Sequence, residues 1–196
     1  VSMRLDDKGY EVIGVDLSKN MLEIAKKKAQ GRPIEWLQAD MRVLEEVPTT
    51  DAVTLFSDSL CYLTDFEDVV SVFEAVYDHL EEGGIFLFDV HSLYQMQEVF
   101  PGYQYHFVED DFAFLWQSYE LDEPGSVEHV IDMYIKQEDG NLYEHFQEVH
   151  EEQTFPIEMV EAALEMVGFT DIKVTADFGR SEVQETSPRW FFQAVK

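Results

Sequence analysis

Hydrophobic residues in the first half of the chain recur with two different periods. Short apolar runs at residues 10–15, 34–37 and 52–56 have the length and composition of buried strands. Apolar residues spaced three and four apart predict helices over residues 21–29 and 66–80. Strands that alternate with helices indicate an α/β fold with a mostly parallel sheet.

Residues at the ends of these helices support their limits. Ser18 offers an N-cap oxygen to the first helix. Thr64 and Glu67 have the spacing of a capping box for the second helix, and we expect Gly83 and Gly84 to end it.

The run 85–90 is apolar on both of its alternating faces, as expected for a central parallel strand between two helical layers. It ends at Asp89 and is followed by His91. Parallel sheets bind ligands at the carboxyl edge of their strands. We therefore expect His91 to lie at a ligand site.

The pattern changes at about residue 95, where single apolar and polar residues begin to alternate. This alternation continues to residue 152 and is interrupted by turn clusters at 122–126 and 138–141. Alternation between tight turns predicts an antiparallel meander. Helical spacing returns at 156–167, and two β-like runs follow at 172–175 and 189–195. We predict a core of residues 1–94 and 153–196, and an insertion of residues 95–152.

Composition and charge narrow the range of partners. The chain has 41 acidic and 13 basic residues, a formal net charge of −28. This charge would repel a polyphosphate backbone over a Debye length of ~8 Å, so nucleic acid is not an expected partner. No apolar run approaches the ~20 residues that cross a membrane, and no secretory signal or cysteine pair is present. These features predict a cytoplasmic protein without a membrane partner.

One acidic residue stands where α/β folds bind nucleotides. Asp16 ends the first apolar run and is followed directly by a helix. A carboxylate at this place accepts hydrogen bonds from the two ribose hydroxyls of a bound nucleotide. The position alone suits a dehydrogenase and a methyltransferase equally well.

Further motifs favour the methyltransferase. The segments GVDLSKNML at 14–22, QADM at 38–41, LFSDSLCYL at 55–63 and GGIFLFDVHS at 83–92 occur in the order of the class I S-adenosylmethionine-dependent methyltransferases. The ending RWFFQAVK resembles the antiparallel closing hairpin of that family. The resemblance implies a Rossmann-like fold with helices on both faces of the sheet, and S-adenosyl-L-methionine as cofactor. It implies that the following residues contact the cofactor: Asp16, Leu17, Asp40, Met41 and Ser57.

The sequence departs from the family at its start. The first strand of the family, and the glycine-rich loop that approaches the methionine portion of the cofactor, do not occur in it. We expect a longer natural protein in which both precede Val1. The alternative is an incomplete cofactor site.

Three residues are candidates for the acceptor side. His91 is one, because histidine side chains in general exchange protons near neutral pH, which suits a general base or a group that orients the acceptor. Its alternative role is to cap a turn. Asp58 and Tyr62 are candidates for the acceptor pocket, and helix capping and packing are their alternatives.

Other chemistry-bearing residues receive structural interpretations. His129, His145 and His150 match no zinc-ligand spacing, so we interpret them as strand-surface histidines and predict no metal site. Cys61 has no neighbouring histidine to activate it, and we interpret it as a small buried packing residue.

The leading hypothesis is a methyltransferase that acts on a small-molecule acceptor by in-line methyl transfer. Residues 95–152 would serve as a lid or as a homodimer interface that sets acceptor specificity. Two alternatives stay open: a catalytically inactive methyltransferase-like binding protein, and an NAD-dependent oxidoreductase.

Overall fold

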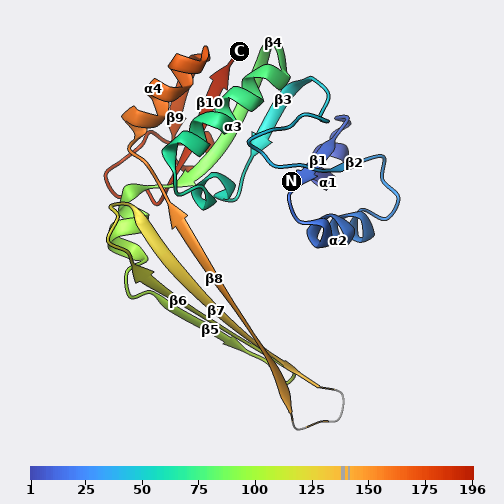
Figure 1. Ribbon diagram of the computed structural model, residues 1–196, viewed down its shortest axis with the longest axis vertical. Coiled ribbons are helices and arrows are strands. Elements are labelled where there is room, and N and C mark those ends of the chain that lie inside the picture. The colour runs from blue at the N-terminus through green and yellow to red at the C-terminus, as the bar shows by residue number, and fades with distance from the viewer. Residues whose placement is uncertain (138–139, 141) are drawn as a thin grey trace.

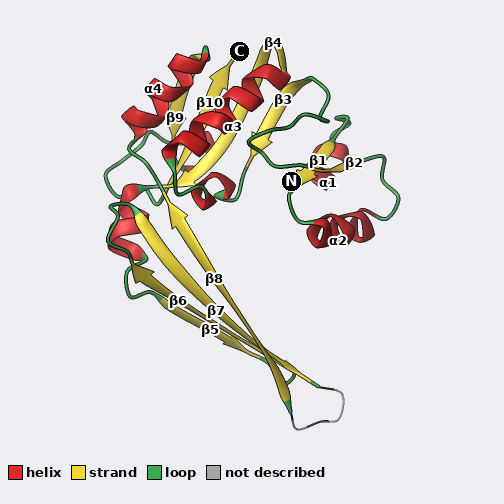
Figure 2. Ribbon diagram, in the orientation of Figure 1, coloured by secondary structure: helices red, strands yellow, loops and turns green. Residues whose placement is uncertain are grey.

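The computed structural model describes residues 1–137, 140 and 142–196 and has a mixed α/β fold (Figures 1 and 2). The helices are α1 (Ser2–Asp6), α2 (Lys19–Ala29), α3 (Phe66–His79) and α4 (Ile157–Val167), with short helical turns η1 (Ser59–Tyr62), η2 (Gln95–Val99) and η3 (Asp177–Gly179). The strands are β1 (Ile13–Asp16), β2 (Glu35–Gln38), β3 (Thr50–Leu55), β4 (Leu80–His91), β5 (Gln104–Val108), β6 (Phe112–Glu120), β7 (Ser126–Lys136), β8 (Tyr143–Gln153), β9 (Thr170–Thr175) and β10 (Arg189–Val195). Among the described residues, no helix has both the length and the apolar character needed to cross a membrane.

A four-stranded sheet of order β3-β4-β10-β9 forms the centre of the fold. β3 and β4 are parallel, and β10 is antiparallel to both β4 and β9. Helices α3 and α4 contact each other and pack on this sheet (Figure 1). Four phenylalanines in the core between these layers are fully buried, and they are Phe73, Phe86, Phe88 and Phe192. This arrangement confirms the predicted α/β fold with an antiparallel terminal hairpin.

Strands β1 and β2 form a separate parallel pair near the N-terminus, and α2 packs against this pair. Gly14 in β1 pairs with Trp36 in β2, and a Cβ at Gly14 would lie 2.4 Å from two carbons of the indole ring. Only glycine permits this close packing. The backbone N–H of Met21 donates to Ser18 Oγ, which confirms the predicted N-cap of α2.

Strands β5 to β8 form a four-stranded antiparallel sheet in sequence order. This sheet confirms the predicted meander, and it extends away from the α/β part of the molecule (Figure 1). Of the turn expected at 138–141, residues 138, 139 and 141 lie outside the described part of the chain. The division of the chain into a core and an insertion stays a prediction.

The limits of α3 differ from the prediction. Its N-cap is Asp65, whose carboxylate accepts the Glu67 N–H at 3.0 Å, so the expected cap by Thr64 is wrong. Gly83 and Gly84 do not end the helix, because α3 stops at His79 and both glycines lie within β4. A Cβ at Gly84 would lie 2.8 Å from the carbonyl oxygen of Glu81, so glycine serves the tight backbone there.

Candidate functional site

The predicted ribose-binding residue lies at the carboxyl end of β1. Asp16 is exposed, and its Oδ1 accepts the Ser18 N–H at 2.8 Å, which fixes the carboxylate at the start of α2. The neighbouring Leu17 is also exposed. Since β1 and β2 are parallel, Asp40, which follows β2, lies at the same edge of the pair.

Asp40 is held by a partner that the sequence did not single out. Its Oδ1 accepts the backbone N–H of Arg42 at 2.9 Å, and its Oδ2 accepts from Arg42 Nη2 at 2.7 Å. These bonds lower the pKa of the Asp40 carboxyl. Arg42 also donates to Asp68 at 2.7 Å, and half-buried Met41 packs against the core. The segment after β2 is therefore fixed in place and charged.

The chain turns sharply after β3. Ser57 and Asp58 have φ angles of 65° and 52°, in the left-handed region that non-glycine residues rarely adopt. The turn is held by Asp89, whose Oδ1 accepts the Ser57 N–H at 2.8 Å. Strained residues of this kind persist where the surrounding structure fixes them. The result is that Asp58 faces the end of β4.

A cavity of about 230 Å³ lies beside this turn. It brings together three residues predicted for the acceptor side, Asp58, Tyr62 and His91. The other lining residues are Phe100, Phe114, Trp116, His129, Ile131, His150 and Glu152. Most of these come from β6, β7 and β8, so the antiparallel sheet forms one wall of the cavity.

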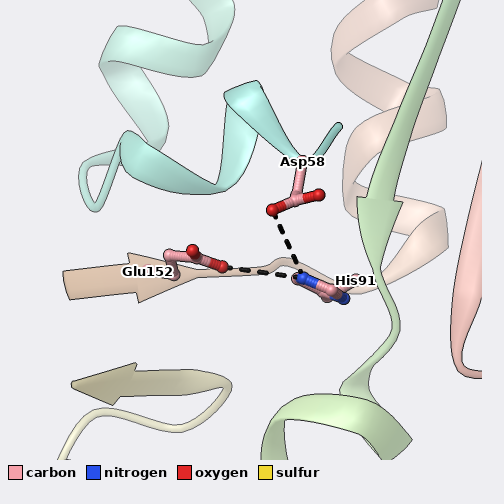
Figure 3. Close-up of side chains that lie close together, drawn as sticks. All are labelled: Asp58, His91 and Glu152. Carbon is pink, nitrogen blue, oxygen red and sulfur yellow. Dashed lines mark ion pairs between the residues drawn. The ribbon is translucent and has the colours of Figure 1, made fainter. Parts of the chain in front are cut away.

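His91 is at the centre of a small polar cluster (Figure 3). Its Nε2 lies 3.5 Å from Asp58 Oδ2 and 3.7 Å from Glu152 Oε2. One ligand atom from each of these three residues lies within 4.8 Å of the others, close enough to share a cation. The ligand atoms come from three distant segments, which is why the spacing of histidines in the sequence did not indicate them.

The cluster contains acids with opposite pKa shifts. Burial raises the pKa of Glu152 to about 7, assisted by the nearby negative charge of Asp58. Burial also disfavours the ionised form of Asp58, but His91 and Arg189 outweigh it and lower its pKa to about 2. Burial lowers the pKa of His129 to about 4, so its imidazole is neutral at neutral pH. Paired acids with separated pKa values are typical of catalytic and binding sites.

Arg189 at the start of β10 supplies the positive charge of the cluster. Its guanidinium donates to Asp58 Oδ1 at 2.8 Å and to buried Asp89, and its Nη2 lies 3.4 Å from His91 Nε2. These contacts join the ends of β3, β4 and β10. Arg189 therefore fixes the geometry of the site.

The three histidines interpreted as strand-surface residues have different environments. The surface interpretation of His129 is wrong, since the residue is only 3% exposed and its Nδ1 lies 2.7 Å from Ser118 Oγ. His150 is half-buried and lines the cavity. His145 lies on the surface and its Nε2 contacts Asp132 at 2.6 Å. Cys61 is buried, as predicted, and burial raises the pKa of its thiol.

Sequence patterns alone missed several residues of the site. Glu152 and His129 lie on strands with many polar residues, where an inward charge is indistinguishable from a surface charge. In the sequence, Trp116 and Phe100 indicate only apolar positions, and nothing marks them as residues of a binding site. Arg189 gave a usable signal, because an arginine in an acidic chain is the first residue of a buried strand.

Comparisons with known proteins agree with this architecture. A family model described as "Methyltransferase domain" matches residues 1–84. The Bacillus subtilis (strain 168) protein named Putative methyltransferase YqeM is 40% identical over 198 residues, which cover 100% of this chain and 79% of the relative. The crystal structure of an S-adenosylmethionine-dependent methyltransferase from Clostridium acetobutylicum is 26% identical, with a TM-score of 0.84, covering 95% of this chain and 75% of that one.

A further solved structure shares the fold at lower identity. It is S-adenosylmethionine-bound CalS10 from Micromonospora echinaspora, an amino pentose methyltransferase involved in calicheamicin biosynthesis. It is 19% identical with a TM-score of 0.70, and the match covers 94% of this chain and 73% of that one.

Parallel strand pairs that carry polar residues at their carboxyl ends define a Rossmann-like, nucleotide-binding class of protein. Within that class, the chain belongs to the class I S-adenosylmethionine-dependent methyltransferases, and its cofactor is S-adenosylmethionine. The NAD-dependent oxidoreductase alternative is thereby set aside.

Proposed function

We propose that this methyltransferase acts on a small molecule that binds in the cavity around His91. The observation that carries the proposal is the cavity itself, which lies at the carboxyl ends of β3 and β4 and is walled by aromatic side chains. Its volume of about 230 Å³ equals that of roughly eight waters at ~30 Å³ each, the scale of a small metabolite. The structural neighbour CalS10 is named as an amino pentose methyltransferase.

The cofactor supplies an electrophilic methyl group, and this chain would hold it along the carboxyl edge. The exposed carboxylate of Asp16 suits the ribose hydroxyls, since it offers two acceptor oxygens at a strand end. Asp40 and Met41 suit the adenine ring, because Arg42 holds that segment in one conformation. Leu17 and Ser57 complete the proposed set. Ser57 precedes Asp58, so its turn would connect the cofactor side with the acceptor side.

His91 is the proposed general base or orienting group. Its ring faces the cavity with Nε2 directed between Asp58 and Glu152, which favours this role over the capping of a turn (Figure 3). A base in this position takes a proton from the acceptor as the new bond forms. Asp58 and Tyr62 would position the acceptor beside it.

We assign acceptor specificity to the β5–β8 sheet. Three of its strands contribute side chains to the cavity, including Trp116, Ile131 and Glu152. The α/β part contributes Asp58 and His91 from the opposite side. Acceptor specificity would then depend on the β5–β8 sheet, and cofactor binding would depend on the strands of the α/β part.

The same sheet is also a proposed homodimer interface. Strand pairing places the exposed side chains of Tyr105, Phe107 and Phe146 on the face that carries Trp116 and Glu152. An apolar face of this kind on a soluble protein marks an interaction surface. We infer that two copies of the chain meet through it.

Methyl transfer from labelled cofactor tests the proposal. The protein is incubated with S-adenosylmethionine carrying a tritiated methyl group and a Bacillus subtilis metabolite extract freed of macromolecules by ultrafiltration. We expect label in a small molecule, and His91→Asn should reduce the initial rate by ~10²-fold or more while calorimetric cofactor affinity is unchanged. Label that appears only in protein or nucleic acid, when these are added back, would overturn the small-molecule acceptor.

A further inference from the structure

Two buried polar side-chain atoms among the described residues have no hydrogen-bond partner, and both belong to residues that line the same cavity. One is the acceptor Oε2 of Glu152 and the other is the donor Nε1 of Trp116. Buried polar groups in folded proteins are nearly always paired, so each exception calls for an explanation. A ligand that offers a donor to Glu152 and an acceptor to Trp116 would satisfy both atoms at once.

The charges around the cavity indicate which donor the ligand offers. The carboxylates of Asp58 and Asp89 share the guanidinium of Arg189, which leaves Glu152 without a hydrogen-bonded cation. His129 lies 3.9 Å from Glu152 Oε2 but is neutral, because burial lowers its pKa. The side chain of Glu152 is only 6% exposed, so water screens this charge poorly. A positively charged donor is the complement of such a carboxylate.

The aromatic walls of the cavity also favour a positively charged ligand. Phe100 packs edge-on against His91 at 5.0 Å and against His129 at 4.7 Å between ring centroids, and Trp116 lies 6.0 Å from Phe100. Aromatic faces attract cations, and their apolar surface strengthens the field of the carboxylate. The pocket thus combines a buried acid with an aromatic wall.

A protonated amine fits these groups better than a metal ion. A metal bound to His91 Nε2 would have the guanidinium of Arg189 as its neighbour, since Arg189 Nη2 lies only 3.4 Å from that nitrogen. A bare ion would also leave the N–H of Trp116 unpaired. An amine that also carries an oxygen satisfies Glu152 and Trp116 together and can bind on the side away from Arg189.

We propose that the acceptor is a small molecule with an amine and a nearby hydroxyl or carbonyl oxygen, and that Glu152 binds the amine while Trp116 donates to the oxygen. The inference rests on the proposed small-molecule function and names the atom that is methylated. The ammonium, paired with the Glu152 carboxylate, first loses one proton to His91 Nε2, the proposed general base, which lies 3.7 Å from Glu152 Oε2. The nitrogen lone pair then forms the N–C bond to the methyl carbon as the C–S bond breaks, the sulfur keeps the bonding pair as a neutral thioether, and the product leaves as a methylated ammonium.

Matched fragments test the proposal. Binding of trans-2-aminocyclohexanol, cyclohexylamine and cyclohexanol to the purified protein is measured by ligand-observed NMR in the presence of EDTA. We expect the amino alcohol to bind roughly tenfold or more tightly than cyclohexanol, because only it places a charge beside Glu152. Glu152→Gln should remove this preference and leave cyclohexanol binding unchanged, whereas Glu144→Gln, an exposed position on the same strand, should keep it.

A separate variant tests the proposed hydrogen bond from Trp116 to the oxygen of the ligand. Trp116→Phe should keep the preference for an amine and reduce the advantage of the amino alcohol over cyclohexylamine to about one. Equal binding of amino alcohol and cyclohexanol by the unmodified protein would overturn the proposal without any variant. So would a preference that survives Glu152→Gln, or one that requires added Zn²⁺ in place of EDTA.

Cofactor binding separates this proposal from the proposed function. If calorimetry shows S-adenosylmethionine binding and the fragments show no amine preference, the amine assignment fails and the small-molecule methyltransferase stands. If the labelled-methyl assay places the label only in macromolecules while the amine preference holds, the proposed function fails and Glu152 and Trp116 still define an amine site.

Discussion

The guanidinium of Arg189 donates to the carboxylate of Asp58 at 2.8 Å and joins residues that are 131 positions apart in the chain. The same guanidinium donates to Asp89, whose side chain is 4% exposed. One cation therefore neutralises two acids that come from the ends of different strands.

Replacing Arg189 with Met should destabilise the protein by about 3–5 kcal/mol, because it leaves buried negative charge without a partner. Urea unfolding measures the change. The double variant Arg189→Met with Asp89→Asn should recover part of the loss, and Arg180→Met, which removes an exposed arginine, serves as the control. A loss no larger than that of the control would show that Arg189 is not needed for the structure of the site.

The pKa of Glu152, raised by burial to about 7, predicts a pH-dependent stability. The folded protein holds this proton more tightly than the unfolded chain, whose carboxyl titrates near 4.5. The resulting stabilisation is complete below pH 4.5 and is lost as the pH rises through 7. Glu152→Gln should therefore gain stability relative to the parent between pH 4.5 and pH 8, on the order of 3 kcal/mol.

Equilibrium unfolding at a series of pH values checks this sign. His129, whose pKa is lowered to about 4, acts in the opposite direction: its contribution is present above pH 6.5 and is lost as the pH falls toward 4. It is common to the parent and the Glu152→Gln variant, so the difference between them reports Glu152. Glu144→Gln should show a flat difference, and a flat difference for Glu152→Gln as well would contradict the prediction.

The proposed ribose contact predicts a loss of cofactor affinity. Asp16→Ala should weaken S-adenosylmethionine binding by about tenfold or more, since a hydrogen bond to a charged group is worth ~1.5–3 kcal/mol. Isothermal titration calorimetry measures the affinity, and Glu11→Ala, an exposed acid just before β1, controls for the change in charge. Equal affinities for Asp16→Ala and the parent would remove Asp16 from the site.

The homodimer proposal predicts different effects on the two faces of one strand. Phe146→Glu changes the face that also carries the cavity residues, whereas Val149→Glu changes the opposite face of β8. We expect the parent and Val149→Glu to sediment as dimers, and Phe146→Glu to sediment as a monomer in equilibrium ultracentrifugation. A monomeric parent would disprove the interface.

Hydrophobic periodicity predicted most of the fold, because the helices α3 and α4 and the central strands β4 and β10 bury apolar residues at regular spacing. It located the edge at which Asp58 and His91 meet, since parallel strands deliver their carboxyl ends to one side of a sheet. It did not predict the burial of His129, because that depends on how η2 packs. Met96 of η2 and Phe100, the residue that follows η2, form a small core with Val127 and cover this end of the sheet.

The burial of the Glu152 carboxylate was not predicted from the sequence, for a related reason. Strand β8 is polar along most of its length, so its period alone does not show which end is covered. Only Glu152 and its C-terminal neighbours are buried, where β8 approaches the end of β4. Which residues form the site depends on which distant segments of the chain come together in space. A local sequence pattern does not contain this information.

The two ends of the β5–β8 segment meet at a single point, where Thr154 Oγ1 donates to the carbonyl oxygen of His91 at 2.7 Å. The chain leaves the central sheet and returns to it at nearly the same place. Mutation, or exchange between related enzymes, can therefore remodel this segment while the strands that face the cofactor keep their order. On the proposal that β5–β8 sets acceptor specificity, this single anchorage would let the methyl-transfer scaffold take new acceptors when the segment is replaced as a unit.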